Sequence, residues 1–148
     1  MKARFKITPA VYLLLQKDNK LLLARRINTN FMDGYYSIPA GHLEGDETLT
    51  EAMIRETKEE IGIDLSKDQL VFVHAMNRKS TDGERIDFFF KAQNCQDEPK
   101  IMEPHKCDAM DWYDLDNLPE NIIPYVKKVI TMVGKDINYS ENDWNIPY

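Results

Sequence analysis

The chain has 148 residues, which is enough for one hydrophobic core and too few for two, so we expect a single domain. Its 43% hydrophobic and 30% charged residues argue against a disordered polypeptide. The formal charge of -6 argues against a protein that binds a nucleic-acid polymer, because such proteins neutralise phosphates with clustered Lys and Arg.

The N-terminal part is predicted to form two strands followed by a polar loop. Within residues 5–15 an apolar run suits a strand that is covered on both faces. Residues 17–20 are typical of a hairpin turn, and residues 21–24 continue as the second strand. The first apolar run is too short for a signal peptide and has no cleavage site, so we expect a cytoplasmic protein.

A helix is predicted after a short extended segment, residues 36–40, and Gly41. Thr48 and Glu51 have the spacing of a capping box, in which the hydroxyl and the carboxylate satisfy opposite backbone N–H groups. Gly62 is the expected end of the helix, because glycine adopts the left-handed conformation found there without strain.

The remaining chain predicts a second hairpin, a short strand and a second helix. The hairpin comprises residues 69–77 and 85–93, the strand residues 110–113, and the helix residues 124–133. These elements predict an α/β (α+β) fold, with a mixed β-sheet between helices. We expect residues 1–134 to form the domain and residues 135–148 to form a tail that packs on it through Tyr139, Trp144 and Tyr148.

Three glutamates share one face of the first predicted helix. At about 100° per residue, Glu59 lies about 60° to one side of Glu56, and Glu60 lies about 40° to the other side. Three like charges repel one another, and a bound Mg²⁺ would offset that repulsion because this ion takes oxygen ligands. The alternative is a surface helix whose charges are only solvated.

Two further residues are predicted to support these acids. The planar fork of Arg55 suits a clamp on a neighbouring carboxylate, for which Glu47 is the candidate. Gly41 allows the preceding loop to fold back close to the acidic face. The arrangement favours metal-assisted hydrolysis of a pyrophosphate bond.

Residues 41–63 resemble the box sequence of the Nudix hydrolase superfamily, and every fixed position of the pattern matches. Thr57 stands where an aliphatic residue is usual, which is expected to weaken one core contact. The resemblance also extends to the strands on either side of the box. The fixed positions are Gly41, Glu47, Arg55, Glu56, Glu59, Glu60, Gly62 and the apolar Ile63.

The resemblance implies an α/β/α sandwich that hydrolyses a phosphoanhydride bond with Mg²⁺ or Mn²⁺. It implies that Glu56, Glu59 and Glu60 coordinate the metal and that the backbone carbonyl of Ala40 also contacts it. Glu56 or a carboxylate outside the box would act as the base. Glu103 is our first candidate for the outside carboxylate, ahead of Glu98 and Asp108, and the alternative for Glu103 is an ordinary loop residue.

Substrate identity depends on residues outside the box. Family members that act on ADP-ribose tend to carry a proline where Arg78 stands, and dinucleoside polyphosphate members tend to carry a tyrosine near Ser80. We therefore expect a nucleoside triphosphate, including oxidised or non-standard ones as for MutT-like members, with a nucleotide sugar or ADP-ribose as the alternative. Candidate substrate contacts are Arg25, Arg26, Arg78 and Tyr36, followed by Arg85, Tyr35 and Tyr125.

Two other functional classes agree less well with the sequence. A non-catalytic Nudix module that senses a nucleotide usually lacks glutamates of the box, and all of them are present here. An RNA-end pyrophosphatase needs a basic track for the polymer, which the acidic balance disfavours. We expect a small nucleotide as the partner, no membrane, and a monomer or homodimer.

Overall fold

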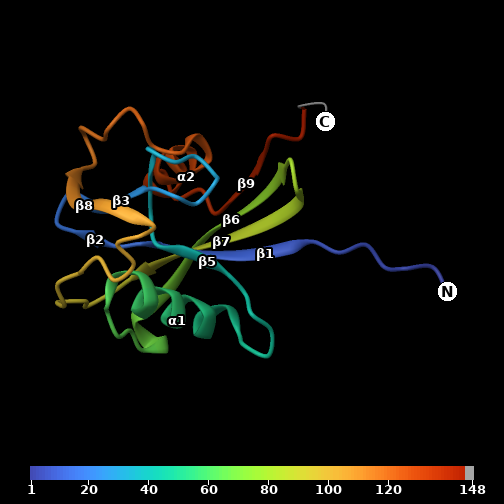
Figure 1. The fold of residues 1–148 in the computed structure, drawn as a ribbon, viewed down its shortest axis with the longest axis horizontal. Helices are drawn as coiled ribbons and strands as arrows, with labels where there is room; N and C mark the ends of the chain where they lie inside the picture. The colour runs from blue at the N-terminus through green and yellow to red at the C-terminus, as the bar shows by residue number, and fades with distance from the viewer. Residues whose placement is uncertain (146–148) are drawn as a thin grey trace.

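The computed structural model describes residues 1–145, with the helices and strands in the order shown in Figure 1. The helices are α1 (Leu49–Ile61), the 3-10 helix η1 (Lys67–Gln69) and α2 (Pro124–Gly134). The strands are β1 (Thr8–Leu14), β2 (Gln16–Lys17), β3 (Lys20–Arg26), β4 (Tyr36–Ser37), β5 (Ala40–His42), β6 (Leu70–Ser80), β7 (Gly83–Ala92), β8 (Cys107–Asp114) and β9 (Tyr139–Asn142).

The strands form two sheets. The larger sheet is mixed and has the order β5-β1-β7-β6-β9, with β1 parallel to β7 and antiparallel to β5. In the smaller sheet β3 pairs antiparallel with β2, β4 and β8. The predicted α+β fold with a mixed sheet between helices is confirmed, and the strands divide further into two sheets.

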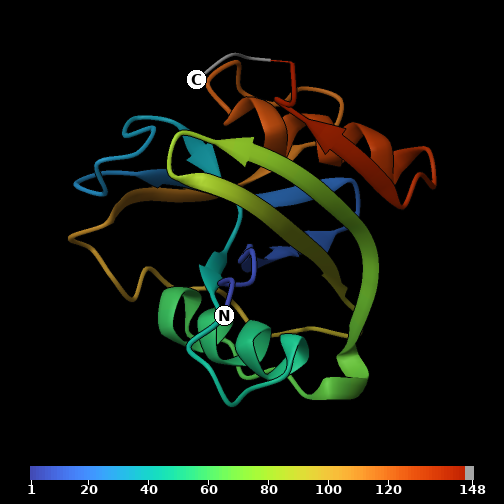
Figure 2. The same ribbon diagram turned by 90° about the vertical axis from the view of Figure 1, so that its right-hand side faces the viewer.

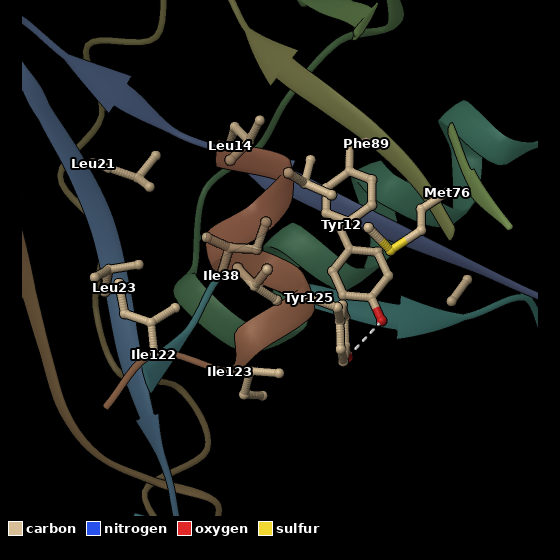
Figure 3. Packing of buried hydrophobic residues seen from close by; sticks show 13 residues of the cluster. Tyr12, Leu14, Leu21, Leu23, Ile38, Met76, Phe89, Ile122, Ile123 and Tyr125 are labelled. Carbon is tan, nitrogen blue, oxygen red and sulfur yellow. Dashed lines mark hydrogen bonds between the residues drawn. The ribbon is translucent and has the colours of Figure 1, made fainter. Parts of the chain in front are cut away.

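Strand β1 explains the packing of the layers. The sheet lies between α1 on one side and α2 on the other (Figures 1 and 2). Val11 and Leu13 point into the core beneath α1, whereas Tyr12 and Leu14 point into the core beneath α2. Figure 3 shows this second core, where the Tyr12 ring stacks on Phe89 with ring centroids 4.6 Å apart. Both faces of β1 are buried, which is why its sequence is a continuous apolar run.

Helix α1 begins and ends where the sequence predicts. The Thr48 hydroxyl accepts a 3.2 Å hydrogen bond from the Glu51 amide, and the Glu51 carboxylate accepts one of 2.8 Å from the Thr48 amide. Gly62 follows the helix with a φ of 71°. Thr57 is fully buried, and its hydroxyl donates a 2.6 Å hydrogen bond to the Met53 carbonyl. The threonine therefore retains its place in the core, with its polar atom satisfied.

The C-terminal segment contributes a strand to the larger sheet. Strand β9 runs parallel to β6, and the buried His74 ring lies 2.7 Å from the Ile137 carbonyl oxygen and 2.8 Å from the Ser140 hydroxyl oxygen. The Trp144 indole donates a 3.0 Å hydrogen bond to the Asn77 carbonyl. Tyr139 is half exposed, and Tyr148 lies outside the described residues.

Strand β8 is longer than the predicted residues 110–113, because pairing with β3 extends it back to Cys107. Among residues 1–145, no helix combines the length and the apolarity that crossing a membrane requires.

Candidate active site

The acidic face of α1 lies against the loop that leads into it. The Ala40 amide donates a 3.2 Å hydrogen bond to the Glu60 carboxylate. Burial raises the pKa of Glu60 to about 8 despite this bond, with a smaller contribution from the neighbouring Glu56 and Glu103. Burial is also the main reason that the pKa of Glu56 is raised. The fold therefore holds at least two carboxyl groups where their charged forms are disfavoured.

Arg55 connects the acids of this region to one another. Its guanidinium donates to both oxygens of Glu47 at 3.0 and 2.9 Å, to Glu56 at 2.8 Å and to Glu59 at 3.4 Å. It also donates a 3.1 Å hydrogen bond to the His42 carbonyl. The structure thus shows the predicted contact of Arg55 with Glu47. Arg55 also orients Glu56 and joins the helix to strand β5.

Gly41 is in direct contact with the Glu56 carboxyl group. A Cβ atom built on Gly41 would overlap all three atoms of that carboxyl group. Backbone and carboxylate therefore approach more closely than any side chain at position 41 would allow. Gly41 is therefore required for steric reasons, which its place in the sequence motif alone does not show.

Glu103 reaches the site because its loop is tied to the end of α1. The Lys100 amide donates a 2.9 Å hydrogen bond to the Ile61 carbonyl, and the Met102 amide donates one of 3.2 Å to the Glu60 carbonyl. These carbonyls belong to the last helical turn and have no partner within the helix. The anchored loop places Glu103 close enough to raise the pKa of Glu56 and Glu60.

A cleft of about 880 Å³ opens beside these acids, between the two sheets. This volume suits a nucleotide-sized ligand. Nine predicted site residues line it, and Glu47, Arg55, Glu59, Tyr35 and Tyr36 do not. The nine are Arg25, Arg26, Ala40, Glu56, Glu60, Arg78, Arg85, Glu103 and Tyr125.

The predicted substrate residues occupy different surroundings. Arg25 forms a two-bond ion pair with Asp108, at 2.7 and 2.8 Å, on the exposed rim. Arg26 donates a 2.9 Å hydrogen bond to the Phe31 carbonyl. Tyr36 packs edge-on against Tyr113, with ring centroids 5.3 Å apart, and is turned away from the cleft.

The second predicted group of arginines lies on β6 and β7. Arg78 is almost fully buried and donates a 2.8 Å hydrogen bond to the fully buried Asp87. Arg85 donates a 2.7 Å hydrogen bond to the His42 ring. Sequence reasoning missed Asp87, although an acid inside the apolar run of residues 86–90 is a signal that a buried partner exists.

The acids fit a hard divalent cation by their chemistry. Within residues 1–145 no three His, Cys, Asp or Glu side chains converge as a preformed metal cage. Arg55 binds Glu56 and Glu59, and the Ala40 amide binds Glu60, so each carboxylate is turned toward a protein donor. The available ligands are all oxygens, and Mg²⁺ typically takes only one or two carboxylates beside water and phosphate oxygens.

Comparison with known proteins decides the family. Residues 5–132 match the model of the NUDIX domain. The chain belongs to the Nudix family. This Nudix protein is an enzyme that hydrolyses phosphorus-containing acid anhydrides, as the pyrophosphatases among its relatives indicate. Nudix hydrolases generally use divalent metals, which agrees with the acidic face of α1.

Its relatives are named for different substrates. The chain is 34% identical over 121 residues to an ADP-ribose pyrophosphatase of Methanocaldococcus jannaschii, covering 80% of this chain and 70% of that protein. It is 35% identical over 71 residues to an 8-oxo-dGTP diphosphatase of Proteus vulgaris, covering 48% and 63%. It is 28% identical over 120 residues to an NAD-capped RNA hydrolase of Stutzerimonas stutzeri, covering 77% and 39%.

Among solved structures, the fold is similar to that of a MutT Nudix hydrolase from Burkholderia pseudomallei. The TM-score is 0.78 at 21% identity, and the alignment covers 86% of this chain and 98% of that one. The Nudix fold expected from the sequence is therefore confirmed. At this identity the similarity shows the fold and not the substrate.

Proposed function

We propose that this Nudix hydrolase is a metal-dependent nucleoside triphosphate pyrophosphohydrolase of the cytoplasm, with oxidised or non-standard nucleotides among its substrates. The observation that carries the proposal is the position of Glu56, Glu60 and Glu103 on one wall of a nucleotide-sized cleft. The partner is then a small nucleotide rather than a nucleic-acid polymer, as the acidic charge of the chain favours.

In this proposal Glu56, Glu59 and Glu60 hold Mg²⁺ or Mn²⁺, with the Ala40 carbonyl as a further ligand. A bound divalent cation neutralises phosphate charge and makes water a stronger nucleophile. Arg55 and Glu47 act as positioning residues, since Arg55 fixes both the Glu56 carboxylate and the His42 backbone. Gly41 allows the substrate-side backbone to approach Glu56.

Glu103 is the proposed base that takes the proton from the attacking water. It lines the cleft, its side chain is about 29% exposed, and it lies near Glu56 and Glu60 without belonging to the Arg55 network. A carboxylate outside the metal-binding set can accept a proton without giving up a ligand. Lys106 lies 3.6 Å from Glu103 and is the nearest charged group on its own loop.

Hydrolysis of ADP-ribose is a second candidate, because the 34% identical relative is named as an ADP-ribose pyrophosphatase. Both candidates use the same acids and differ only in what the far end of the cleft accepts. A nucleotide sugar would use the same chemistry. The distinction therefore rests on substrate turnover.

The experiment is a panel of nucleoside triphosphates, nucleotide sugars and ADP-ribose, assayed with Mg²⁺ and with Mn²⁺. We expect pyrophosphate and a nucleoside monophosphate from at least one triphosphate, with Glu59→Gln abolishing turnover. The Lys58→Gln variant changes an exposed neighbour on the same helix and serves as the control. Turnover of ADP-ribose alone would replace the proposal with the second candidate, and no turnover at all would favour a nucleotide-sensing module.

A further inference from the structure

A buried polar cluster forms one end of the active-site cleft, away from the acids of α1. Tyr12, Arg78 and Tyr125 line the cleft there, and Asp87 lies directly behind Arg78. The two tyrosine hydroxyls are 3.1 Å apart (Figure 3). The proposed chemistry of phosphate hydrolysis makes no use of any of these four residues.

Arg78 is held rigidly by its neighbours. Its guanidinium carbon lies 3.9 Å from the centre of the Tyr125 ring, and its Nε donates to Asp87 Oδ2. Stacking on one side and an ion pair at Nε fix the plane of the guanidinium, so little conformational freedom is left to lose on binding. Asp87 also compensates a positive charge that would otherwise be costly at this depth.

The outer donors of Arg78 are unused. Within residues 1–145, the Arg78 guanidinium makes one hydrogen bond, from Nε to Asp87. Its Nη1 and Nη2 atoms donate to no protein acceptor in that part of the chain. Asp87 Oδ1 is fully buried and has no hydrogen-bond partner among the described residues. Neither Nη1 nor Nη2 of Arg78 is both fully buried and unpaired in this way. Because Arg78 lines the cleft, its free donors are open to a ligand there.

The position of the cluster matches the far end of a nucleotide. In the larger sheet, His42 of β5 pairs with Ala10 of β1, and Ala10 pairs with Asp87 of β7. Asp87 is therefore two strand spacings, about 10 Å, from the backbone next to Gly41 and Glu56. A nucleotide whose phosphates lie at the acids of α1 would place its base near Arg78.

The walls of this end suit a base better than a phosphate. Arg78 and Asp87 form a neutral pair, which attracts an anion weakly, and Tyr12, Tyr125 and Ala10 supply flat or apolar surface. Two adjacent donors on a rigid guanidinium match two adjacent acceptors, which guanine presents as O6 and N7. Adenine presents N7 beside an amino group, which Arg cannot accept because it is donor-only.

We propose that Arg78, fixed by Asp87 and Tyr125, is a specificity-determining residue that selects a 6-oxopurine base over adenine. This inference rests on the proposed function, since it takes the cleft to hold a nucleotide with its phosphates at α1. It deepens that proposal by naming the base. It assigns Arg78 to the base and not to the phosphates.

The test measures binding of the product-like monophosphates GMP, IMP and AMP by calorimetry, which requires no turnover. We expect the wild-type protein to bind GMP and IMP at least about tenfold more tightly than AMP, because a good bidentate base contact discriminates by that order. The Arg78→Gln/Asp87→Asn double variant removes both charges and offers one donor and one acceptor. It should bind AMP as well as GMP or better.

Two further variants keep the test decisive. Arg78→Lys retains the charge opposite Asp87 but lacks the fork, so it should lose the preference even if the double variant fails to fold. The matched control Lys58→Gln/Asp64→Asn removes an exposed ion pair and should keep the preference. Thermal unfolding establishes that each variant is folded.

Three outcomes would overturn the inference. The first is that the wild-type affinities for GMP and AMP lie within twofold of each other, and the second is that no monophosphate binds. The third is that Arg78→Lys loses affinity equally for GMP and AMP, which would make Arg78 a phosphate contact. Failure of the proposed function is separate. A protein that prefers GMP but hydrolyses no triphosphate keeps this inference and loses the other.

Discussion

The backbone amide of Ala40 donates a 3.2 Å hydrogen bond to the carboxylate of Glu60, joining the strand before the box helix to an acid on that helix. This contact offsets only part of the cost of placing Glu60 in buried surroundings, since its pKa remains raised from 4.5 to about 8. The protein alone therefore does not neutralise the negative charge of the ionised Glu60 carboxylate. The pH behaviour of the metal-free protein should reveal this.

Glu60→Gln should stabilise the metal-free protein increasingly as the pH rises. The folded pKa is raised, so the unfolded chain ionises first and wild-type stability falls between about pH 4.5 and pH 8. Glutamine has no such loss. Thermal unfolding in the presence of a chelator, at pH 5, 6.5 and 8, should show that the melting temperature of the variant exceeds that of the wild type by a growing margin. A margin that does not change with pH would contradict the raised pKa of Glu60.

Addition of Mg²⁺ or Mn²⁺ should reduce the advantage of Glu60→Gln above pH 8. A ligand that binds only the folded state stabilises it by about 2.7 kcal/mol at one hundred times its dissociation constant. The wild-type melting temperature should rise with metal, whereas that of Glu60→Gln should rise little. Equal responses of the two proteins would remove Glu60 from the metal site.

Gly41→Ala should reduce kcat by about 100-fold with a much smaller effect on stability. The added methyl group overlaps the Glu56 carboxyl group, and small displacements of a reacting group have effects of this order. Gly134→Ala is the matched control, because a Cβ there meets no atom within 4 Å. Steady-state kinetics on the best substrate of the panel, with melting temperatures, would measure both effects.

Arg55→Lys should lower kcat by about 10- to 100-fold, the size expected when a supporting contact is lost. Lysine cannot reach Glu47, Glu56 and the His42 carbonyl together, as the planar guanidinium does. Glu47→Gln weakens only one of these contacts and should have a smaller effect. Kinetics of both variants would test the order, and a larger effect of Glu47→Gln would mean that Glu47 acts directly.

Glu103→Gln should lower kcat by about 100-fold or more while KM and the Mg²⁺ requirement stay near wild type, as expected for a lost general base. Glu98→Gln is the control, because Glu98 lies on the same loop but is exposed and paired with Lys17. If the two variants behaved alike, the base would have to be sought within the box.

Much of the fold could be predicted because local signals agree with the tertiary structure. Thr48, Glu51 and Gly62 determine both ends of α1 through backbone hydrogen bonding and a left-handed turn, which are local effects. The apolar run of β1 reports burial on both faces. The division into two sheets was not predicted, because strand partners are set by long-range packing.

The family and the acidic face of α1 could both be predicted from residues 41–63, because these residues are contiguous and a helix converts their spacing into geometry. The tertiary structure, by contrast, sets what surrounds that face. It tied Glu103 to the helix end, turned Tyr36 away from the cleft, and paired Arg78 with Asp87 inside it. Those relations join segments far apart in the chain, so they depend on how the sheets pack and not on any local pattern.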